Sequence, residues 1–108
     1  MIDTLNSNGI TISRGGVVFK LYYLEKEHHY FGYFINDSGI LPVKSNNNNE
    51  VADFIYNKLN ETTGDINIHF KYSVELPKKK KKQIQALFSN DNMTFNYYNI
   101  SKLIRLIK

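Results

Sequence analysis

The sequence predicts an α+β fold, in which a mostly antiparallel sheet begins with an N-terminal β-meander and carries about three helices on one face. In the first half, apolar residues alternate with a period of two between turn signals, whereas later segments repeat apolar residues every three to four positions. The predicted order is β-β-β-β-α-β-α-β-α. Hairpins followed by helices favour helices that cover one sheet face, and residues 1–108 have the length of a single domain.

Four short strands make up the predicted meander. Arg14-Gly15-Gly16 is expected to form a hairpin turn, because paired glycines adopt positive φ angles easily. Residues 25–28 form a charged connection, and residues 36–39 carry the turn signal Asn-Asp-Ser-Gly. Pro42 cannot donate a ladder hydrogen bond, so the last strand is expected at a sheet edge or strand end. The four strands are predicted at residues 10–13, 17–24, 29–35 and 40–43.

The next two elements are a helix and a strand. The helix follows the polar loop 45–49, which offers an asparagine N-cap, and is expected to end near Gly64. Residues 66–76 then alternate between apolar and polar side chains, which predicts a strand with one buried and one solvated face. Phe70, on the apolar side, is expected in the core, where removing its ring would cost about 3 to 5 kcal/mol. In the helix predicted after the loop 45–49, the apolar stripe consists of Val51, Phe54, Ile55 and Leu59.

Two more helices are predicted towards the C-terminus. Pro77 suits the first position of a helix with an apolar stripe at Ile84, Leu87 and Phe88. Residues 93–98 are predicted as a last short strand, after which Asn99 is expected to cap the final helix. That helix has apolar residues on one side and a basic outer face. Its apolar stripe is Ile100, Leu103, Ile104 and Ile107.

Positive charge is concentrated in the C-terminal third of the chain. The net charge is +4, and residues 76–108 hold eight Lys or Arg residues against Asp91 alone. Five lysines at residues 78–82 begin a predicted helix, where a phosphate would receive both lysine charge and backbone N–H bonds. The stems of Lys80 and Lys81 are expected to pack towards the core. The predicted nucleic-acid-binding residues are Lys78, Lys79, Lys82, Lys102, Arg105 and Lys108.

Composition offers a second explanation of the lysine run. Asn, Lys, Ile and Tyr, whose codons are rich in A and T, are frequent, which indicates an AT-rich microbe, phage or mobile element. Runs such as residues 46–49 and 78–82 can expand through codon bias alone, and charge runs commonly serve solubility. The sequence leaves both explanations open.

Aromatic residues are unusually dense in the meander. Both faces of the predicted strands at residues 17–24 and 29–35 are largely apolar, although helices on one side would cover only one face. Base stacking, a dimer interface and ordinary burial are the three explanations for the second apolar face. The residues assigned to it are Tyr22, Leu24, Tyr30 and Phe34.

The sequence contains none of the common compact motifs for catalysis or cofactor binding. It has no cysteine, which excludes thiolate chemistry and fits a reducing compartment. His28 and His29 would point to opposite faces of a strand, so no metal site is predicted, and no cofactor is expected. An acid–base pair of His29 or His69 with a glutamate is the remaining enzymatic option.

These observations predict a non-enzymatic binding protein that engages nucleic acid through the lysine run and the basic last helix. The alternative is a protein-binding inhibitor, adaptor or immunity-like factor that uses the aromatic sheet face and forms a homodimer. An uncharacterised hydrolase or nuclease is the third hypothesis. The N-terminus does not have the pattern of a secretory signal, and no apolar run reaches the roughly 20 residues of a membrane span. We therefore expect a cytoplasmic protein without a membrane partner.

Overall fold

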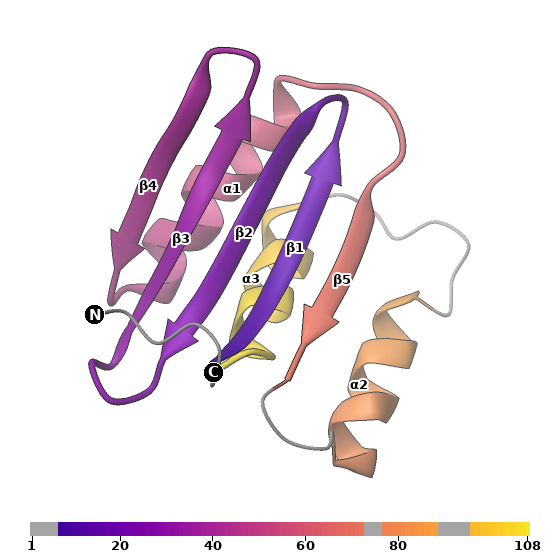
Figure 1. Cartoon of the computed structure of the whole chain (residues 1–108). Helices are drawn as coiled ribbons and strands as arrows, with labels where there is room; N and C mark the ends of the chain where they lie inside the picture. Colours follow the sequence, from indigo (N-terminus) through magenta and orange to yellow (C-terminus); the bar gives the residue numbers. More distant parts are fainter. Residues whose placement is uncertain (1–6, 73–76, 89–95) are drawn as a thin grey trace.

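The computed structural model describes residues 7–72, 77–88 and 96–108, in which five antiparallel strands form one sheet with helices behind it (Figure 1). The strand order is β4-β3-β2-β1-β5, so the meander is continued by β5 beside β1. This confirms the predicted α+β class and the mostly antiparallel sheet. The strands are β1 (Asn8–Arg14), β2 (Val17–Leu24), β3 (His29–Asn36), β4 (Gly39–Ser45) and β5 (Asn67–Lys71).

Three helices accompany the sheet: α1 (Asn48–Asn60), α2 (Lys78–Phe88) and α3 (Tyr97–Arg105). Figure 1 shows α1 and α3 side by side behind the sheet, whereas α2 lies beyond β5 at the end of the sheet. Two helices therefore cover one face, and α2 extends the molecule sideways. The described helices include none that is long and apolar enough to cross a membrane.

The β1–β2 hairpin is tied to the end of α1. Gly15 and Gly16 have φ angles of 57° and 85°, as the predicted turn requires. Next to them, the Arg14 side chain donates hydrogen bonds from Nε to the Gly64 carbonyl oxygen at 3.1 Å and from Nη1 to the Leu59 carbonyl oxygen at 3.4 Å. The Arg14 guanidinium thus satisfies backbone oxygens at and just after the end of α1.

Asparagines cap both helices that cover the sheet. The Asn47 side chain accepts hydrogen bonds from the backbone N–H groups of Asn49 and Glu50, which confirms the predicted asparagine cap. In α3 the cap is Asn96, whose side chain accepts from the Asn99 N–H at 2.8 Å, so the predicted cap at Asn99 is wrong. The extended backbone of Asn96 lets the helix begin one turn earlier.

That earlier start changes the end of the predicted strand at residues 93–98. Tyr97 and Tyr98 belong to α3 rather than to a strand, and residues 93–95 lie outside the described part of the chain. The strand predicted at residues 66–76 is shorter than expected, since β5 spans Asn67–Lys71 and residues 73–76 are likewise not described. Its alternation between half-buried and exposed side chains follows the predicted pattern.

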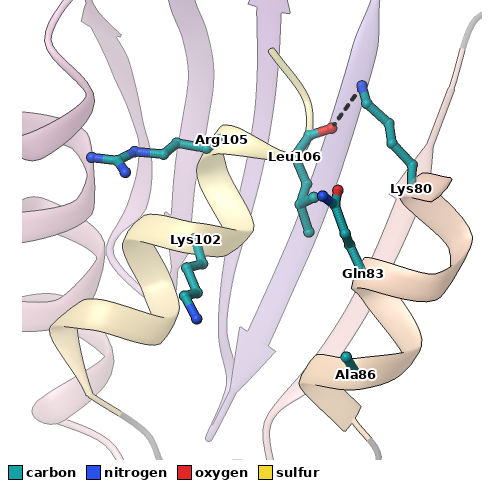
Figure 2. A pocket seen from close by; sticks show the side chains of 6 residues that line it. All are labelled: Lys80, Gln83, Ala86, Lys102, Arg105 and Leu106. Carbon is teal, nitrogen blue, oxygen red and sulfur yellow. Dashed lines mark hydrogen bonds between the residues drawn. The ribbon is translucent and has the colours of Figure 1, made fainter.

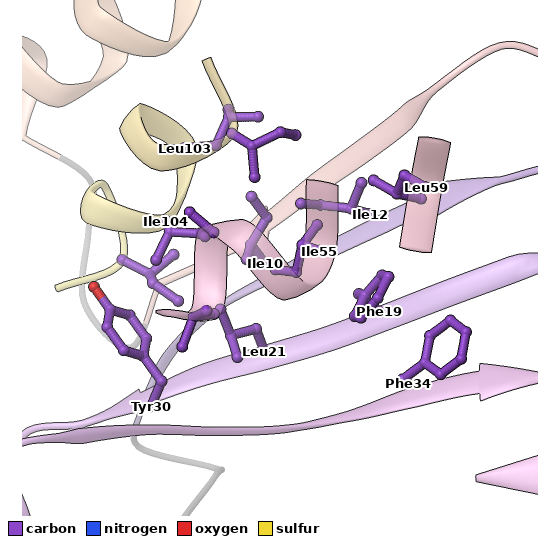
Figure 3. Close-up of a cluster of buried hydrophobic side chains, with 14 residues drawn as sticks. Ile10, Ile12, Phe19, Leu21, Tyr30, Phe34, Ile55, Leu59, Leu103 and Ile104 are labelled. Atoms are coloured by element: carbon purple, nitrogen blue, oxygen red, sulfur yellow. The ribbon is translucent and has the colours of Figure 1, made fainter. Parts of the chain in front are cut away.

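The core lies between the sheet and the helices α1 and α3 (Figure 3). Phe19 is buried in this core, and its ring centroid lies 4.8 Å from that of Phe34 and 5.8 Å from that of Phe54. Buried side chains from three strands meet those of both helices, which fixes the sheet against them. The buried core residues are Ile10, Ile12, Phe19, Leu21, Tyr30, Phe34, Val51, Ala52, Ile55, Leu59, Ile100, Leu103, Ile104 and Ile107.

Two of the aromatic residues assigned to the uncovered face are in this core, which corrects the assignment. β2 and β3 pair with Phe19 opposite Phe34 and with Tyr23 opposite Tyr30. Residues directly opposite each other share a sheet face. Because Phe19 faces the helices, Phe34 must do so as well, and the period of two takes Tyr30 to the same side. Both are buried.

Tyr30 joins three elements through hydrogen bonds. Its hydroxyl donates to Asn48 Oδ1 at 2.5 Å, and Asn48 Nδ2 donates to Ser101 Oγ at 3.3 Å. These two bonds give hydrogen-bond partners to the buried Tyr30 and Ser101 side chains through Asn48, in the first turn of α1. Burial, assisted by the neighbouring Tyr23, raises the pKa of Tyr30 to about 12.

This raised pKa predicts a loss of stability at alkaline pH. An unfolded chain ionises tyrosine near pH 10, so between about pH 10 and 12 the folded state keeps a proton that the unfolded state loses. The free energy of unfolding should therefore fall as pH rises through that window, by about 2 to 3 kcal/mol from Tyr30. Tyr30→Phe should be less stable at neutral pH, because Asn48 loses a partner, but should depend less steeply on pH above 10.

Urea unfolding of the parent and of Tyr30→Phe between about pH 10 and 12 measures this change in the free energy of unfolding. Tyr98→Phe, which removes a hydroxyl from a side chain that is 65% exposed, is the matched control. Equal alkaline slopes for the parent and Tyr30→Phe would contradict the assignment.

Candidate nucleic-acid interface

The predicted cationic residues occupy the outer surfaces of α2 and α3 and the chain end. Lys78, Lys79 and Lys82 are exposed on α2, and Lys102 and Arg105 are exposed on α3. A groove of about 510 Å³ separates the two helices (Figure 2). Its lining residues are Lys80, Gln83, Ala86, Lys102, Arg105 and Leu106. The fold therefore brings the lysine run and the basic last helix, which are distant in sequence, onto one side of the molecule.

Within the groove, Lys80 already has partners in the protein. Its Nζ donates to the Leu106 carbonyl oxygen at 3.4 Å and lies 5.5 Å from the centre of the Tyr72 ring. The Tyr72 hydroxyl donates to the same carbonyl oxygen at 3.1 Å, and burial raises the pKa of Tyr72. Half-burial of Lys80 agrees with the expected packing of its stem, whereas the expectation for Lys81 is wrong because Lys81 is exposed.

The charged groups of α3 do not converge on one point. Figure 2 shows the Arg105 guanidinium directed away from α2, and Lys102 Nζ lies 4.4 Å from the Tyr98 ring centre. Lys108 lies apart, at a hollow that includes Glu25 and His28, with its Nζ 5.8 Å from the Tyr23 ring centre. The arrangement is therefore a broad positive surface rather than a closed pocket for one phosphate.

We call the exposed cations of α2 and α3, namely Lys78, Lys79, Lys81, Lys82, Lys102 and Arg105, the helix surface. Neither helix contains an aspartate or a glutamate, as the printed sequence of each shows. No carboxylate from these two helices can therefore neutralise their charge. Such a surface attracts polyanions over a distance set by the salt concentration.

The opposite side of the sheet forms a second surface, here called the open face, because no described helix lies over it (Figure 1). Alternation and register place Tyr22, Phe31 and Tyr33 there, with Tyr22 directly opposite Phe31. Lys20 is opposite Tyr33, and Lys44 is opposite Phe31, so both lysines border the aromatic group. On the described strands, no residue that points to this face is acidic.

The aromatic rings of the open face have defined neighbours. The Phe31 and Tyr33 ring centroids are 5.2 Å apart at an interplanar angle of 84°. Lys71 Nζ lies 5.6 Å from the Tyr22 ring centre. The Tyr22 ring lies over Gly9, where an added Cβ would come within 2.8 Å of a ring carbon. The backbone at Gly9 thus supports the ring from one side.

The predicted interface residues are divided between the two sides of the sheet. Tyr22 is on the open face, and Leu24 points to the same side but is buried, whereas Tyr30 and Phe34 are in the core. Sequence reasoning missed Phe31 and Tyr33, although both are on the open face and Tyr33 is 37% exposed. The register between β2 and β3 was the missing information, because it pairs Tyr22 with Phe31.

The described residues contain no cluster of three or more His, Cys, Asp or Glu that could hold a metal ion. His29 Nδ1 lies 3.3 Å from the Glu27 carbonyl oxygen, and His69 is exposed on β5. Within the part of the chain that the structure describes, neither His29 nor His69 forms an ion pair or hydrogen bond with a carboxylate.

Comparison with known proteins adds no relative: no protein-family model, no curated protein and no solved structure matches this chain.

Proposed function

We propose that this chain is a non-enzymatic nucleic-acid-binding protein whose helix surface contacts the phosphate backbone. The observation that supports the proposal is the gathering of six exposed cations on two helices that contain no carboxylate. Phosphodiester chains carry regularly spaced negative charges, and Lys or Arg contacts to them release bound counterions. A broad surface of separate cations suits such a partner better than it suits one small anion.

The form of the helix surface also predicts how binding discriminates. Phosphate contacts position a nucleic acid but carry no sequence information. The lysine side chains of α2 end in solvent, apart from Lys80, which donates to Leu106. We therefore expect binding through the helix surface to be strongly salt-dependent and nearly independent of sequence.

Fluorescence anisotropy with a labelled single-stranded oligonucleotide tests the proposal. If four phosphates are contacted, affinity should fall about 50-fold between about 50 and 200 mM salt, given a slope near 0.7 per contact. A peptide nucleic acid with the same bases and an uncharged backbone is the control and should bind far more weakly. No binding at the lower salt concentration, or affinity that is independent of salt, would contradict the proposal.

The alternative function, a protein-binding adaptor or inhibitor, uses the open face instead. Ile40, which is 66% exposed and lies on the same face as Tyr33, is the observation that favours it. A partner protein recovered with the chain after nuclease digestion would support this alternative.

A further inference from the structure

Aromatic and cationic side chains are combined on the open face, away from the helix surface. Tyr22, Phe31 and Tyr33 form one group across two neighbouring central strands. Lys20, Lys44 and Lys71 surround that group, and no strand residue on this face is acidic. A partner that fits must present flat apolar groups together with negative charge.

We infer that the open face is a base-stacking surface and that it makes the chain prefer single-stranded nucleic acid. This inference rests on the proposed function, since it names the form of nucleic acid that binds. In a duplex, the flat faces of the bases are stacked inside the helix and only base edges reach the grooves. A single strand can turn its base faces outward onto aromatic side chains, and each base can do so because each has a π-face.

The Phe31 and Tyr33 rings form an edge-to-face pair on the open face. Phe31 and Tyr33 are two residues apart on β3, which places their Cα atoms about 7 Å apart. Their planes are nearly perpendicular, at 84°, so the pair presents the face of one ring beside the edge of the other. A base stacked on the first ring would contact the positive edge of the second. Tyr22, which lies opposite Phe31 on β2, offers a further ring to the same bound nucleic-acid strand.

The lysines of the open face select the partner by charge. A second copy of the chain would bring the same surface with it, because a two-fold interface is self-complementary. The lysines of one copy would then face the lysines of the other. The strand residues of this face include no carboxylate that could offset the repulsion, so such a dimer is unfavourable. The phosphates of a single strand complement Lys20 and Lys44 instead, while its bases cover the apolar rings.

Two oligomers of equal length and charge separate stacking from electrostatics. One is oligo-dT, and the other is an abasic sugar–phosphate chain. The full-length chain should bind oligo-dT more tightly than the abasic chain, by about 5- to 150-fold for each stacked base. The double variant Phe31→Leu with Tyr33→Leu should lose most of this preference but still bind both oligomers through the helix surface.

Tyr97→Leu is the matched control, because Tyr97 is 37% exposed like Tyr33 but belongs to α3 on the other side of the sheet. It should keep the preference for bases. A thermal melt of each variant verifies that it is folded. Because the chain contains no tryptophan, Phe31→Trp adds a single reporter whose fluorescence should be quenched by oligo-dT and not by the abasic chain.

The results distinguish the inference from the proposed function. If the parent binds neither oligomer nor a duplex, the proposed function fails. If the parent binds oligo-dT and the abasic chain equally and the double variant behaves like the parent, the stacking inference is overturned while the proposed function stands. If sedimentation shows a dimer that the double variant converts to a monomer, the open face is an interface between copies and the inference is again overturned.

Discussion

Replacing Phe19 by alanine is expected to lower the free energy of unfolding by about 3 to 5 kcal/mol. The Phe19 ring is 2% exposed and packs against Phe34 and against Phe54 of α1. Its removal would take away the buried apolar surface and leave a cavity between the sheet and the helix. Because the surrounding rings are held by β3 and α1, the cavity cannot close fully.

Phe70→Ala is the matched control for this prediction. Phe70 is half-buried in β5, at the end of the strand order, and its ring stacks on Tyr72 at 6.0 Å. Alanine there should cost less than at Phe19, although the sequence alone assigned Phe70 the full cost of a core ring. Urea unfolding of the two variants gives the comparison. A loss at Phe70 equal to or larger than that at Phe19 would contradict the prediction that the more deeply buried ring contributes more to stability.

The second large effect concerns binding. Replacing Lys78, Lys79 and Lys82 together by glutamine should make the slope of log affinity against log salt less negative by up to about 2, given about 0.7 per phosphate contact on a single strand. If the two lines meet at about 1 M salt, affinity near 0.1 M should be about 100-fold weaker. Stability should stay the same or rise, because the changes remove cations from the positive end of the α2 dipole.

Lys26→Gln provides the control for net charge. Lys26 is exposed in the connection between β2 and β3, outside both the helix surface and the open face. Its effect on the slope should be smaller than one third of the triple variant's effect. Anisotropy titrations at several salt concentrations measure all three proteins. If the triple variant has the same slope of log affinity against log salt as the parent, the lysine run does not contact the nucleic acid, and codon bias is left as the explanation of the run.

The sequence predicted the cationic part of the candidate site better than the aromatic part. Charged side chains at a helix surface can be located from helical spacing alone, and Lys102 and Arg105 are exposed opposite the buried stripe of α3. Helical spacing does not predict the contacts of Lys80. Its hydrogen bond to the Leu106 carbonyl oxygen depends on how α2 lies against α3, which no local pattern specifies.

Local patterns determined the elements themselves. The stripe Ile100, Leu103, Ile104 and Ile107 is fully buried, and the polar loop before α1 provides the asparagine cap. Each of these features depends on spacings of a few residues, which the sequence displays directly. The meander, the edge position of β4 with Pro42, and the α+β class followed from the same kind of pattern.

Only the tertiary structure decided which face of the meander is buried. Alternation separates the side chains of β3 into two sets, but both sets are aromatic, so hydrophobicity cannot tell which set faces the helices. The register with β2, where Phe34 is opposite Phe19, and the packing of α1 on that side settle it. Tyr30 and Phe34 therefore stabilise the fold, and Phe31 and Tyr33 remain on the open face, because a pleated strand can bury only one of its two sides against a single layer of helices.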